Sequence, residues 1–241
     1  QLLLINNMHV FVIHVKGVDH RLKHMQQELV KANLSAEFIL EGDKHELNSG
    51  ILANYFTGKM AVVSNASSCA YKHIKAYEEI VRMELPEAII FEDDIYLDKH
   101  FSEKLQQCKS EIKTRQLENY IISLEETSLR YVKGSKRKKG TLLYPNSRGR
   151  MAGAYLVDYK SASNMLADLA QNKTDQAIDW YHNNCINKQI INMFWIHPTI
   201  AIQGSISGRL DSTISNRRTN YFRISSFYLQ RWYKKILWGL R

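Results

Sequence analysis

Strand-like and helix-like apolar patterns alternate along the first part of the chain, and this alternation restricts the fold more than any other feature. The segment MHVFVIHV at 8–15 is rich in β-branched and aromatic residues, which is typical of a buried strand. It is followed at 19–33 by a segment whose apolar residues recur at helical spacing, at Leu22, Met25, Leu29 and Val30. We therefore expect a first strand that leads directly into a helix.

The same alternation continues further along the chain. A second strand is expected at 36–43, a helix at 65–85 that ends before Pro86, and a third strand at 87–91. The helix has three N-cap candidates: Asn65, Ser67 and Ser68. Later strands are expected at 120–124, near 153–157 and within 193–204. The order strand–helix–strand–helix–strand predicts an α/β fold with an open, mostly parallel sheet.

Three adjacent acids, Glu92, Asp93 and Asp94, follow the third strand directly. Adjacent carboxylates raise one another's pKa unless a cation neutralises them. Open α/β sheets bind ligands outside the carboxyl ends of their strands, and hard oxygen ligands suit Mg²⁺ or Mn²⁺. One interpretation is therefore a site for a metal bound to a nucleotide diphosphate. The other is a solvated strand end or a helix-capping cluster.

The length and the cysteine content limit the classes of protein to which the chain can belong. The 241 residues suffice for one large α/β domain or two small ones. No apolar run approaches the ~20 residues of a membrane span, and we interpret the apolar start as a first strand after a short leader, not as a signal peptide. Cys69, Cys108 and Cys185 are far apart and form no CxxC pair, which argues against a disulfide framework or a zinc site and fits a reducing cytosol.

The formal net charge of +9 predicts attraction to an anionic partner, which is nucleic acid, a phospholipid surface or an acidic substrate. The charge is polarised, because 85–103 is acidic whereas 133–140 and the tail from Arg217 are basic. Such polarity favours a docking surface. The basic segment 133–140 is either a clamp for a phosphorylated acceptor or a solvated, mobile loop.

Two motifs around the acids resemble a known family. The stretch CAYKH at 69–73, the helix after it and the strand end FEDD at 91–94 resemble the central motif of glycosyltransferase family 25. That family includes bacterial lipooligosaccharide galactosyltransferases and the related collagen galactosyltransferases. The resemblance extends over roughly residues 8–205.

Other stretches agree with this resemblance. Asp19 to Arg21 looks like the family's Asp-Arg turn, Gly153 to Tyr155 like its Gly-x-x-Ala-Tyr strand, and Asp179 lies in a segment like the Asp-containing one that comes next. The pattern is departed from in three places: Ala66 stands near the place of a usual acid, Lys72 stands where a Ser is usual, and His20 offsets the Arg of the Asp-Arg turn.

The resemblance implies a fold and an activity. The fold would be GT-A-type and Rossmann-like, with helices on both faces of the sheet and a helical, basic C-terminal extension. The donor would be a UDP-sugar, most often UDP-galactose, and transfer would be inverting and assisted by Mn²⁺ or Mg²⁺. The acceptor would be a lipid-linked oligosaccharide of lipooligosaccharide or lipopolysaccharide, and no nucleic acid is expected as a partner. The expected location is cytoplasmic, peripheral on the inner face of the bacterial cytoplasmic membrane.

An inverting transfer needs three roles. The first is metal binding, for which Asp94 is the first choice and Glu92 and Asp93 support it; Glu92 and Asp94 should point to the same side of the strand. The second is recognition of the nucleotide and sugar, assigned to His14, Val15, Arg21, Glu41, Asp43, His73, Asp93, Gly153 and Tyr155. The third is a general base for the acceptor hydroxyl, assigned to Asp179 with Glu125 and Glu126 as alternatives.

The chain is expected to divide into a catalytic domain at 1–216 and a basic, aromatic tail at 217–241. At 221–241 the tail mixes Arg and Lys with Phe, Tyr, Trp and Leu, and on a helix the apolar residues fill one broad side. That composition is typical of a helix on an anionic membrane surface, and a helix packed against the domain is the alternative.

Four other functions compete with glycosyl transfer. The basic, aromatic segments favour a nucleic-acid-binding protein, which leaves the acids at the strand end unexplained. A metal-dependent nuclease would use them, but usually with acids from several elements. A glycoside hydrolase needs two separated carboxylates, which Asp94 and Asp179 supply. A glycan-binding relative without activity fits the altered Cys motif.

Overall fold

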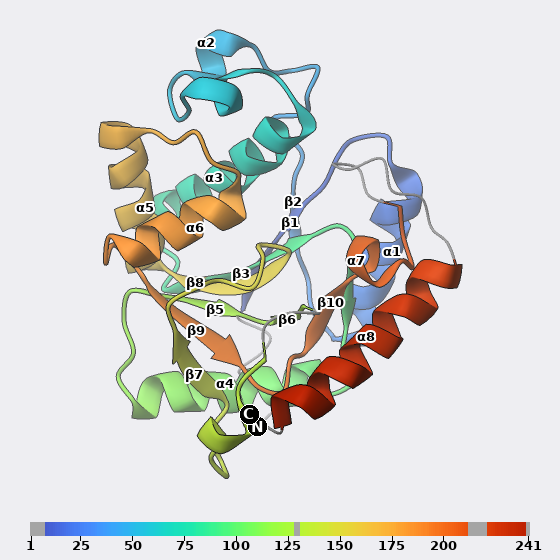
Figure 1. Cartoon of the computed structure of the whole chain (residues 1–241). Helices are drawn as coiled ribbons and strands as arrows, with labels where there is room; N and C mark the ends of the chain where they lie inside the picture. Colours follow the sequence, from blue (N-terminus) through green and yellow to red (C-terminus); the bar gives the residue numbers. More distant parts are fainter. Residues whose placement is uncertain (1–7, 128–130, 212–220, 240–241) are drawn as a thin grey trace.

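The structure is a computed structural model that describes residues 8–127, 131–211 and 221–239, and a seven-stranded sheet lies at its centre (Figure 1). The strand order is β2-β1-β3-β8-β5-β9-β7. The bounds are β1 His9–Ile13, β2 Glu37–Ile39, β3 Glu87–Glu92, β5 Tyr120–Ser123, β7 Leu143–Asn146, β8 Ala154–Asp158 and β9 Asn192–Ile196. The strands expected from the apolar patterns are therefore present.

The sheet is mostly parallel. β1 pairs in parallel with β2 and β3, and β5 pairs in parallel with β9. β8 lies antiparallel between β3 and β5, and β7 lies antiparallel beside β9. Five strands thus point one way and two the other, which confirms the predicted α/β class. Ile13 at the end of β1 is in register with Glu92 at the end of β3, so both strands deliver their following residues to one edge.

Helices cover both faces of the sheet (Figure 1). One apolar core lies between the sheet and the helices α3 (Asn65–Arg82), α5 (Tyr159–Asn172) and α6 (Ile178–Asn187). The other lies between the sheet and the helices α1 (Asp19–Lys31) and α4 (Phe101–Thr114). Two short elements, α2 (Ser49–Leu52) and the 3₁₀ helix η2 (Gly58–Ala61), precede α3.

A three-stranded sheet adjoins the carboxyl edge of the large one. It contains β4 (Ile95–Leu97), β10 (Ala201–Gln203) and β6 (Glu125–Glu126) in the order β4-β10-β6, and the short helix α7 (Gly204–Ser207) follows β10. The backbone N–H of Gly204 donates to the carbonyl of Asp94 at 2.7 Å. This sheet therefore fixes the path of the chain just after the third acid.

The N-cap of α3 lies one residue before the first expected candidate. Ser64 is its N-cap, and the side chains of Ser64 and Ser67 form a reciprocal capping box with each other's backbone N–H groups. Both hydroxyls satisfy N–H groups that the first helical turn leaves without partners. The expected N-cap positions were thus wrong by one residue, although Ser67 takes part.

The last described element, α8 (Tyr221–Gly239), confirms a helical extension. Its Phe227 is buried, and Arg231 forms an ion pair with Glu126 of β6, so one side packs on the domain. The other side exposes large apolar residues: Leu229, Trp232, Tyr233, Ile236 and Leu237. The expected boundary at 216/217 lies outside the described residues. Within the described part of the chain, no helix combines the length and apolarity of a membrane span.

The basic segment 133–140 is exposed and contains the 3₁₀ helix η3 (Gly134–Lys136), which α8 contacts. The Arg137 guanidinium donates to the carbonyl of Val132. The segment is therefore exposed, which both interpretations allow.

Candidate functional site

A cleft of about 210 Å³ opens at the carboxyl edge of β1 and β3. Its walls come from the ends of these two strands, from α1 and from the first turns of α3. The lining residues are Ile13, Val15, Arg21, Lys44, Asn65, Ser68, Cys69, Lys72, Glu92 and Asp93. The position is the one that open parallel sheets use for ligands, and several of the predicted site residues meet there.

Lys72 and Asp43 form the floor of the cleft. Both are 1% exposed, and the Lys72 ammonium lies 2.8 Å from Asp43 Oδ1. The ammonium also donates to the carbonyls of His14 at 2.7 Å and Leu40 at 3.0 Å. Lys72 therefore connects the ends of β1 and β2 to α3. At this position, where the chain departs from the pattern described above, the side chain stabilises the fold.

Gly42 has a conformation and a close contact that require glycine. Its φ is +96°, and a Cβ at this position would lie 2.3 Å from the Tyr71 ring. The Ser68 hydroxyl donates to its carbonyl at 2.6 Å. The turn between β2 and Asp43 is therefore packed directly onto α3.

Arg21 and His14 hold Asp93. Arg21 is 4% exposed, and its guanidinium donates to Asp93 Oδ1 at 2.6 Å. His14 Nδ1 lies 2.8 Å from Asp93 Oδ2. Burial alone would raise the pKa of Asp93, but these two partners hold it below its ordinary value. Arg21 is thus neither a solvated helix-start charge nor a free phosphate ligand, because its main partner is the carboxylate.

Asp94 lies behind the cleft. Its Oδ2 accepts the backbone N–H of Ser205 at 3.0 Å, and its Oδ1 is buried with no hydrogen-bond partner in the described part of the chain. Burial and the charge of Glu92 raise its pKa. β3 ends at Glu92 and the chain then turns, so Glu92 and Asp93 line the cleft and Asp94 does not. Which of the three acids bind metal stays a prediction.

Glu92 links the cleft to a buried polar layer. Its Oε1 lies 3.7 Å from Cys69 Sγ and 3.6 Å from His73 Nε2, and its Oε2 accepts from Gln203 Nε2 at 3.1 Å. Burial, reinforced by the charge of Asp93, raises the pKa of Glu92 to about 7. The carboxyl can therefore change its protonation state near neutral pH.

His73 and Tyr155 lie behind Glu92 and away from the lining of the cleft. His73 is 0% exposed, and burial lowers its pKa to about 3, so the imidazole is neutral. Its Nδ1 lies 2.8 Å from the Tyr155 hydroxyl, which in turn meets Tyr77 at 2.7 Å, and Tyr77 meets His182 at 2.7 Å. Neither of these two predicted ligand-binding residues lines the cleft, and their part in ligand binding stays a prediction.

Gly153 also supports the site from behind. Its N–H donates to Glu125 Oε1 at 3.0 Å, and its carbonyl accepts the N–H of Glu92 at 2.8 Å. A Cβ here would lie 2.0 Å from Gln203 Nε2. The absence of a side chain at Gly153 therefore lets Gln203 reach Glu92.

Asp179 lies in the first turn of α6 and is partly exposed. Its carboxylate has no hydrogen bond or ion pair within the described residues. Its charge nevertheless favours the protonated form of Cys69, His73 and Glu92, although at His73 burial outweighs it. The structure thus brings this predicted base close to the cleft and leaves its carboxylate available.

The two alternative bases, Glu125 and Glu126, lie outside the cleft. Glu125 is 0% exposed, and burial and the charge of Glu92 raise its pKa well above the ordinary value. Glu126 forms an ion pair with Arg231 of α8. Neither carboxylate lines the cleft, so the structure does not support them as bases for an external hydroxyl.

Val15 and Glu41, both predicted to bind the nucleotide, lie in different places relative to the cleft. Val15 is 36% exposed at the lip of the cleft. Glu41 points to the outer side of α3, near the Tyr71 hydroxyl at 3.3 Å and the Lys75 ammonium at 3.9 Å. Glu41 does not line the cleft, because β2 ends at Ile39 and the chain has already turned, and its contact with the nucleotide stays a prediction.

Sequence reasoning did not assign Lys44, Asn65, Ser68 and Cys69 to the nucleotide site, although all four line the cleft. The first turns of α3 face it, and the positive end of a helix dipole favours anions. The N-cap signal near Asn65 could have pointed to this. Gln203 has no comparable local signal, because it reaches Glu92 from the distant strand β10.

The carboxylates of Glu92, Asp93 and Asp94 do not come together as the ligands of one metal ion. Described ligand atoms that gather within 4.8 Å of one another belong to two other groups. One is Cys69, His73 and Glu92, a softer set than Mn²⁺ or Mg²⁺ prefers, and the other is Asp43, His45 and Glu46. Glu92 and Asp93 nonetheless border the cleft together. Mg²⁺ is often bound by one or two carboxylates plus phosphates and water, so this edge fits an ion that arrives with a nucleotide. Asp94 does not belong to that edge.

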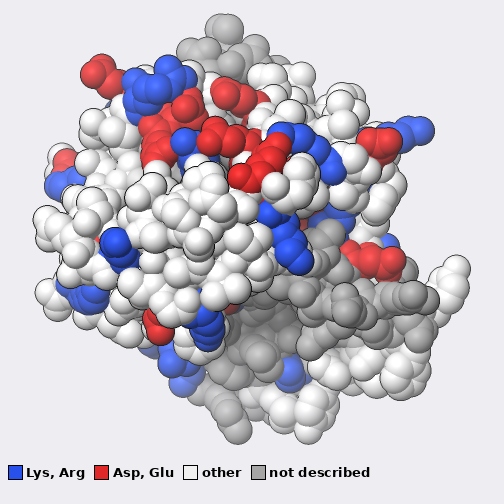
Figure 2. Space-filling model, turned by 90° about the horizontal axis from the view of Figure 1, so that it is seen from above, with Lys and Arg blue, Asp and Glu red and all other residues white. Residues whose placement is uncertain are grey.

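Charges of both signs lie side by side on the face seen in Figure 2, which is viewed from the side of α2 and α3. Acidic residues gather there next to Lys and Arg. This face therefore carries no uniformly basic surface of the kind that the net charge alone suggested.

Three comparisons with known proteins gave matches. A model of glycosyltransferase family 25 (LPS biosynthesis protein) matches residues 7–181. Probable inactive glycosyltransferase 25 family member 3 of Rattus norvegicus is 25% identical over 126 residues, which make up 48% of this chain and 22% of the rat protein. The crystal structure of mouse xyloside xylosyltransferase 1 in its apo form matches with a TM-score of 0.39 and 13% identity, over 76% of this chain and 83% of the mouse chain.

Proposed function

The chain belongs to glycosyltransferase family 25, and from this premise we propose that it transfers a hexose from a UDP-sugar to a sugar acceptor of lipooligosaccharide or lipopolysaccharide. Galactose is the first choice of hexose. The fold is of the GT-A type, with the donor at the carboxyl edge of the sheet and the acceptor toward the C-terminal half. Donor, acceptor and linkage are the parts of this proposal that experiments must decide.

The observation that carries the proposal is the position of Asp179 beside the cleft. The cleft combines a helix N-terminus and Lys44, which suit phosphates, with the carboxylates Glu92 and Asp93. Asp179 approaches from α6 and influences Glu92 electrostatically. A nucleotide site and an available carboxylate therefore lie next to each other, as a displacement reaction requires.

The chemistry assigned to the chain is one displacement. The acceptor oxygen forms a bond with the anomeric carbon while the bond from that carbon to the nucleotide diphosphate breaks, and Asp179 takes the hydroxyl proton. The sugar is transferred with inversion and UDP leaves with the electron pair. Lys44 and the start of α3 would orient the diphosphate, and Glu92 and Asp93 would hold a divalent cation. Such a cation, when bound, offsets the charge that develops on the leaving group.

A screen of donors tests the activity. UDP-galactose, UDP-glucose and their N-acetyl forms are added with and without Mn²⁺ to a delipidated core oligosaccharide acceptor, and UDP release and thermal shift are recorded. We expect UDP release with one of these donors and a larger thermal shift in the presence of the ion. No shift and no release with any of the four would overturn the proposal.

Asp179→Asn tests the base. The variant keeps the size and location of the side chain but cannot accept the proton, so transfer should fall by about 100-fold or more while UDP binding stays normal. Near-normal turnover with intact donor binding would eliminate Asp179. Asp175→Asn, an exposed carboxylate on the loop before α6, is the matched control.

We further propose that α8 rests on an anionic membrane, which would bring the enzyme to a lipid-linked acceptor on the inner face of the bacterial cytoplasmic membrane. The exposed apolar side of α8 and the neighbouring basic segment 133–140 support this. Flotation with phosphatidylglycerol vesicles should be lost in Leu229→Glu and kept in the adjacent control Gln230→Glu. Equal flotation of both variants would refute the membrane role.

A glycan-binding protein without activity is the second candidate. Two observations favour it: the rat relative is named as a probable inactive member of the family, and both carboxylate oxygens of Asp93 already have partners in Arg21 and His14. The donor screen separates the two functions, because a silent relative would show a thermal shift with glycan but release no UDP.

A further inference from the structure

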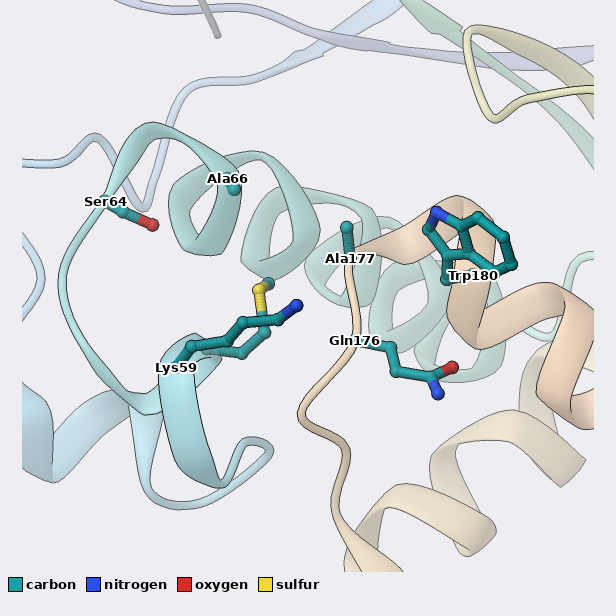
Figure 3. Close-up of a pocket in the computed structure, with 7 residues that line it drawn as sticks. Lys59, Ser64, Ala66, Gln176, Ala177 and Trp180 are labelled. Carbon is teal, nitrogen blue, oxygen red and sulfur yellow. The ribbon is translucent and has the colours of Figure 1, made fainter.

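A second cavity, of about 640 Å³, lies on the other side of the start of α3 (Figure 3). Its residues come from η2, from the first turn of α3 and from the segment that enters α6. They are Lys59, Met60, Ser64, Ala66, Gln176, Ala177 and Trp180. The cavity is open to solvent, and most of its wall is apolar.

This cavity adjoins the donor cleft. Asn65 lines the cleft, while its neighbours Ser64 and Ala66 line the cavity, so the first turn of α3 is the partition between them. On the opposite wall, Trp180 of the cavity directly follows Asp179. Asp179 lines neither site, but its charge acts on Cys69 and Glu92 of the cleft while its neighbour Trp180 lines the cavity.

Trp180 gives the cavity the character of a sugar-binding platform. It is 54% exposed, and its indole N–H has no hydrogen-bond partner within the described residues. An aromatic ring with an apolar face and a polar edge is suited to a ligand that is itself apolar on one face and polar at its rim. The Lys59 ammonium and the Gln176 amide lie on the walls that flank it and can bind hydroxyl or acidic groups (Figure 3).

We propose that this cavity is the subsite for the acceptor glycan, in which a pyranose ring stacks on Trp180. The inference rests on the proposed glycosyl transfer and extends it by assigning the second substrate to a place. A ring seated on Trp180 would lie near Asp179, which directly precedes Trp180 in α6. Lys59 and Gln176 then select among acceptors through their contacts at the rim.

Two measurements test the subsite. Binding of methyl galactoside, methyl glucoside and methyl N-acetylglucosaminide is followed by saturation-transfer NMR without donor, and transfer kinetics follow with the oligosaccharide of the donor screen. Trp180→Ala should weaken glycoside binding and raise the acceptor KM by about tenfold or more, because the stacking face is lost. The KM for the UDP-sugar and the affinity for UDP should not change.

Matched variants distinguish a platform from a general defect. Trp180→Phe keeps an aromatic face and should retain most of the binding, whereas Trp232→Ala, an exposed Trp on α8, should bind glycosides like the wild type. An unchanged acceptor KM in Trp180→Ala would overturn the subsite, as would a change only in oligomeric state, which would mean that the cavity binds protein.

The two proposals fail in different ways. Absence of UDP release in the wild type, with glycoside binding that depends on Trp180, would refute the transferase and leave the subsite standing. Normal transfer that is indifferent to Trp180 would refute the subsite and leave the transferase standing.

Discussion

The buried ion pair of Lys72 and Asp43 makes a prediction whose size follows from the structure. In Lys72→Met the apolar stem is kept and the ammonium is lost. The Asp43 carboxylate, 1% exposed, then loses its partner at 2.8 Å, and the carbonyls of His14 and Leu40 lose a donor. Asp43 Oδ2 keeps the backbone N–H of Lys16 at 3.1 Å. An uncompensated buried charge therefore dominates the cost.

Breaking a buried pair by removing one partner costs about 3–5 kcal/mol. For a chain of this size, each kcal/mol lowers Tm by about 2–4 °C, so Lys72→Met should melt about 6–20 °C below the wild type. Calorimetry and urea unfolding monitored by circular dichroism measure both quantities. The exposed pair of Lys160 and Glu118 supplies the control, because Lys160→Met should change the free energy of unfolding by less than about 0.5 kcal/mol.

The double variant Lys72→Met/Asp43→Asn tests the cause. If the buried charge is responsible, neutralising Asp43 should restore at least about 1.5 kcal/mol of the loss. The reasoning is refuted if Lys72→Met costs less than about 1 kcal/mol, or if the second substitution adds to the loss. UDP binding should fall in Lys72→Met in either case, because its side chain lines the cleft.

Three further predictions concern single features. Glu92→Gln should raise the free energy of unfolding at pH 8 by up to about 3 kcal/mol, and by under about 1 kcal/mol at pH 5, in urea titrations without metal. The folded-state pKa of Glu92 is raised from 4.5 to about 7, so the wild type loses stability as pH rises through that window, and the variant does not. An equal gain in stability at both pH values would contradict this prediction. Gly153→Ala should cost more than about 2 kcal/mol and lower transfer, because the new Cβ meets Gln203. Normal activity would show that this contact relaxes. Ser64→Ala should lower stability by about 1 kcal/mol through loss of the Ser67 capping box, and thermal melts would disprove this if Tm were unchanged.

Local patterns were enough to predict the main framework. The β-branched stretch at 8–15, the helical spacing at 19–33 and the strand at 87–91 each correspond to an observed element, because each carries its own apolar periodicity. The predicted parallel sheet also implied that the ends of its strands meet at one edge. The position of the cleft followed from that alone.

The roles of the three acids could not be read in the same way. Alternation along a strand predicted that Glu92 and Asp94 face together, but β3 stops at Glu92. The turn is fixed by β10 and α7, whose Gly204 and Ser205 bind the backbone and side chain of Asp94 from more than a hundred positions away. No local pattern in the sequence predicts a contact between residues so far apart in the chain. Burial of His73 and Glu125 is likewise a property of the assembled layers.

The pairing of Asp93 with Arg21 has a consequence for the donor. Glu92, Asp93 and Asp94 together would repel a diphosphate, yet Arg21 and His14 compensate Asp93, and the pKa values of Glu92 and Asp94 are raised. The carboxylates at this edge therefore carry less net negative charge than their number suggests near neutral pH. A phosphate can approach the start of α3, and a cation that arrives with it would shift Glu92 toward its ionised form. Donor and metal should then bind cooperatively, with the stronger coupling below pH 7, where Glu92 is otherwise protonated.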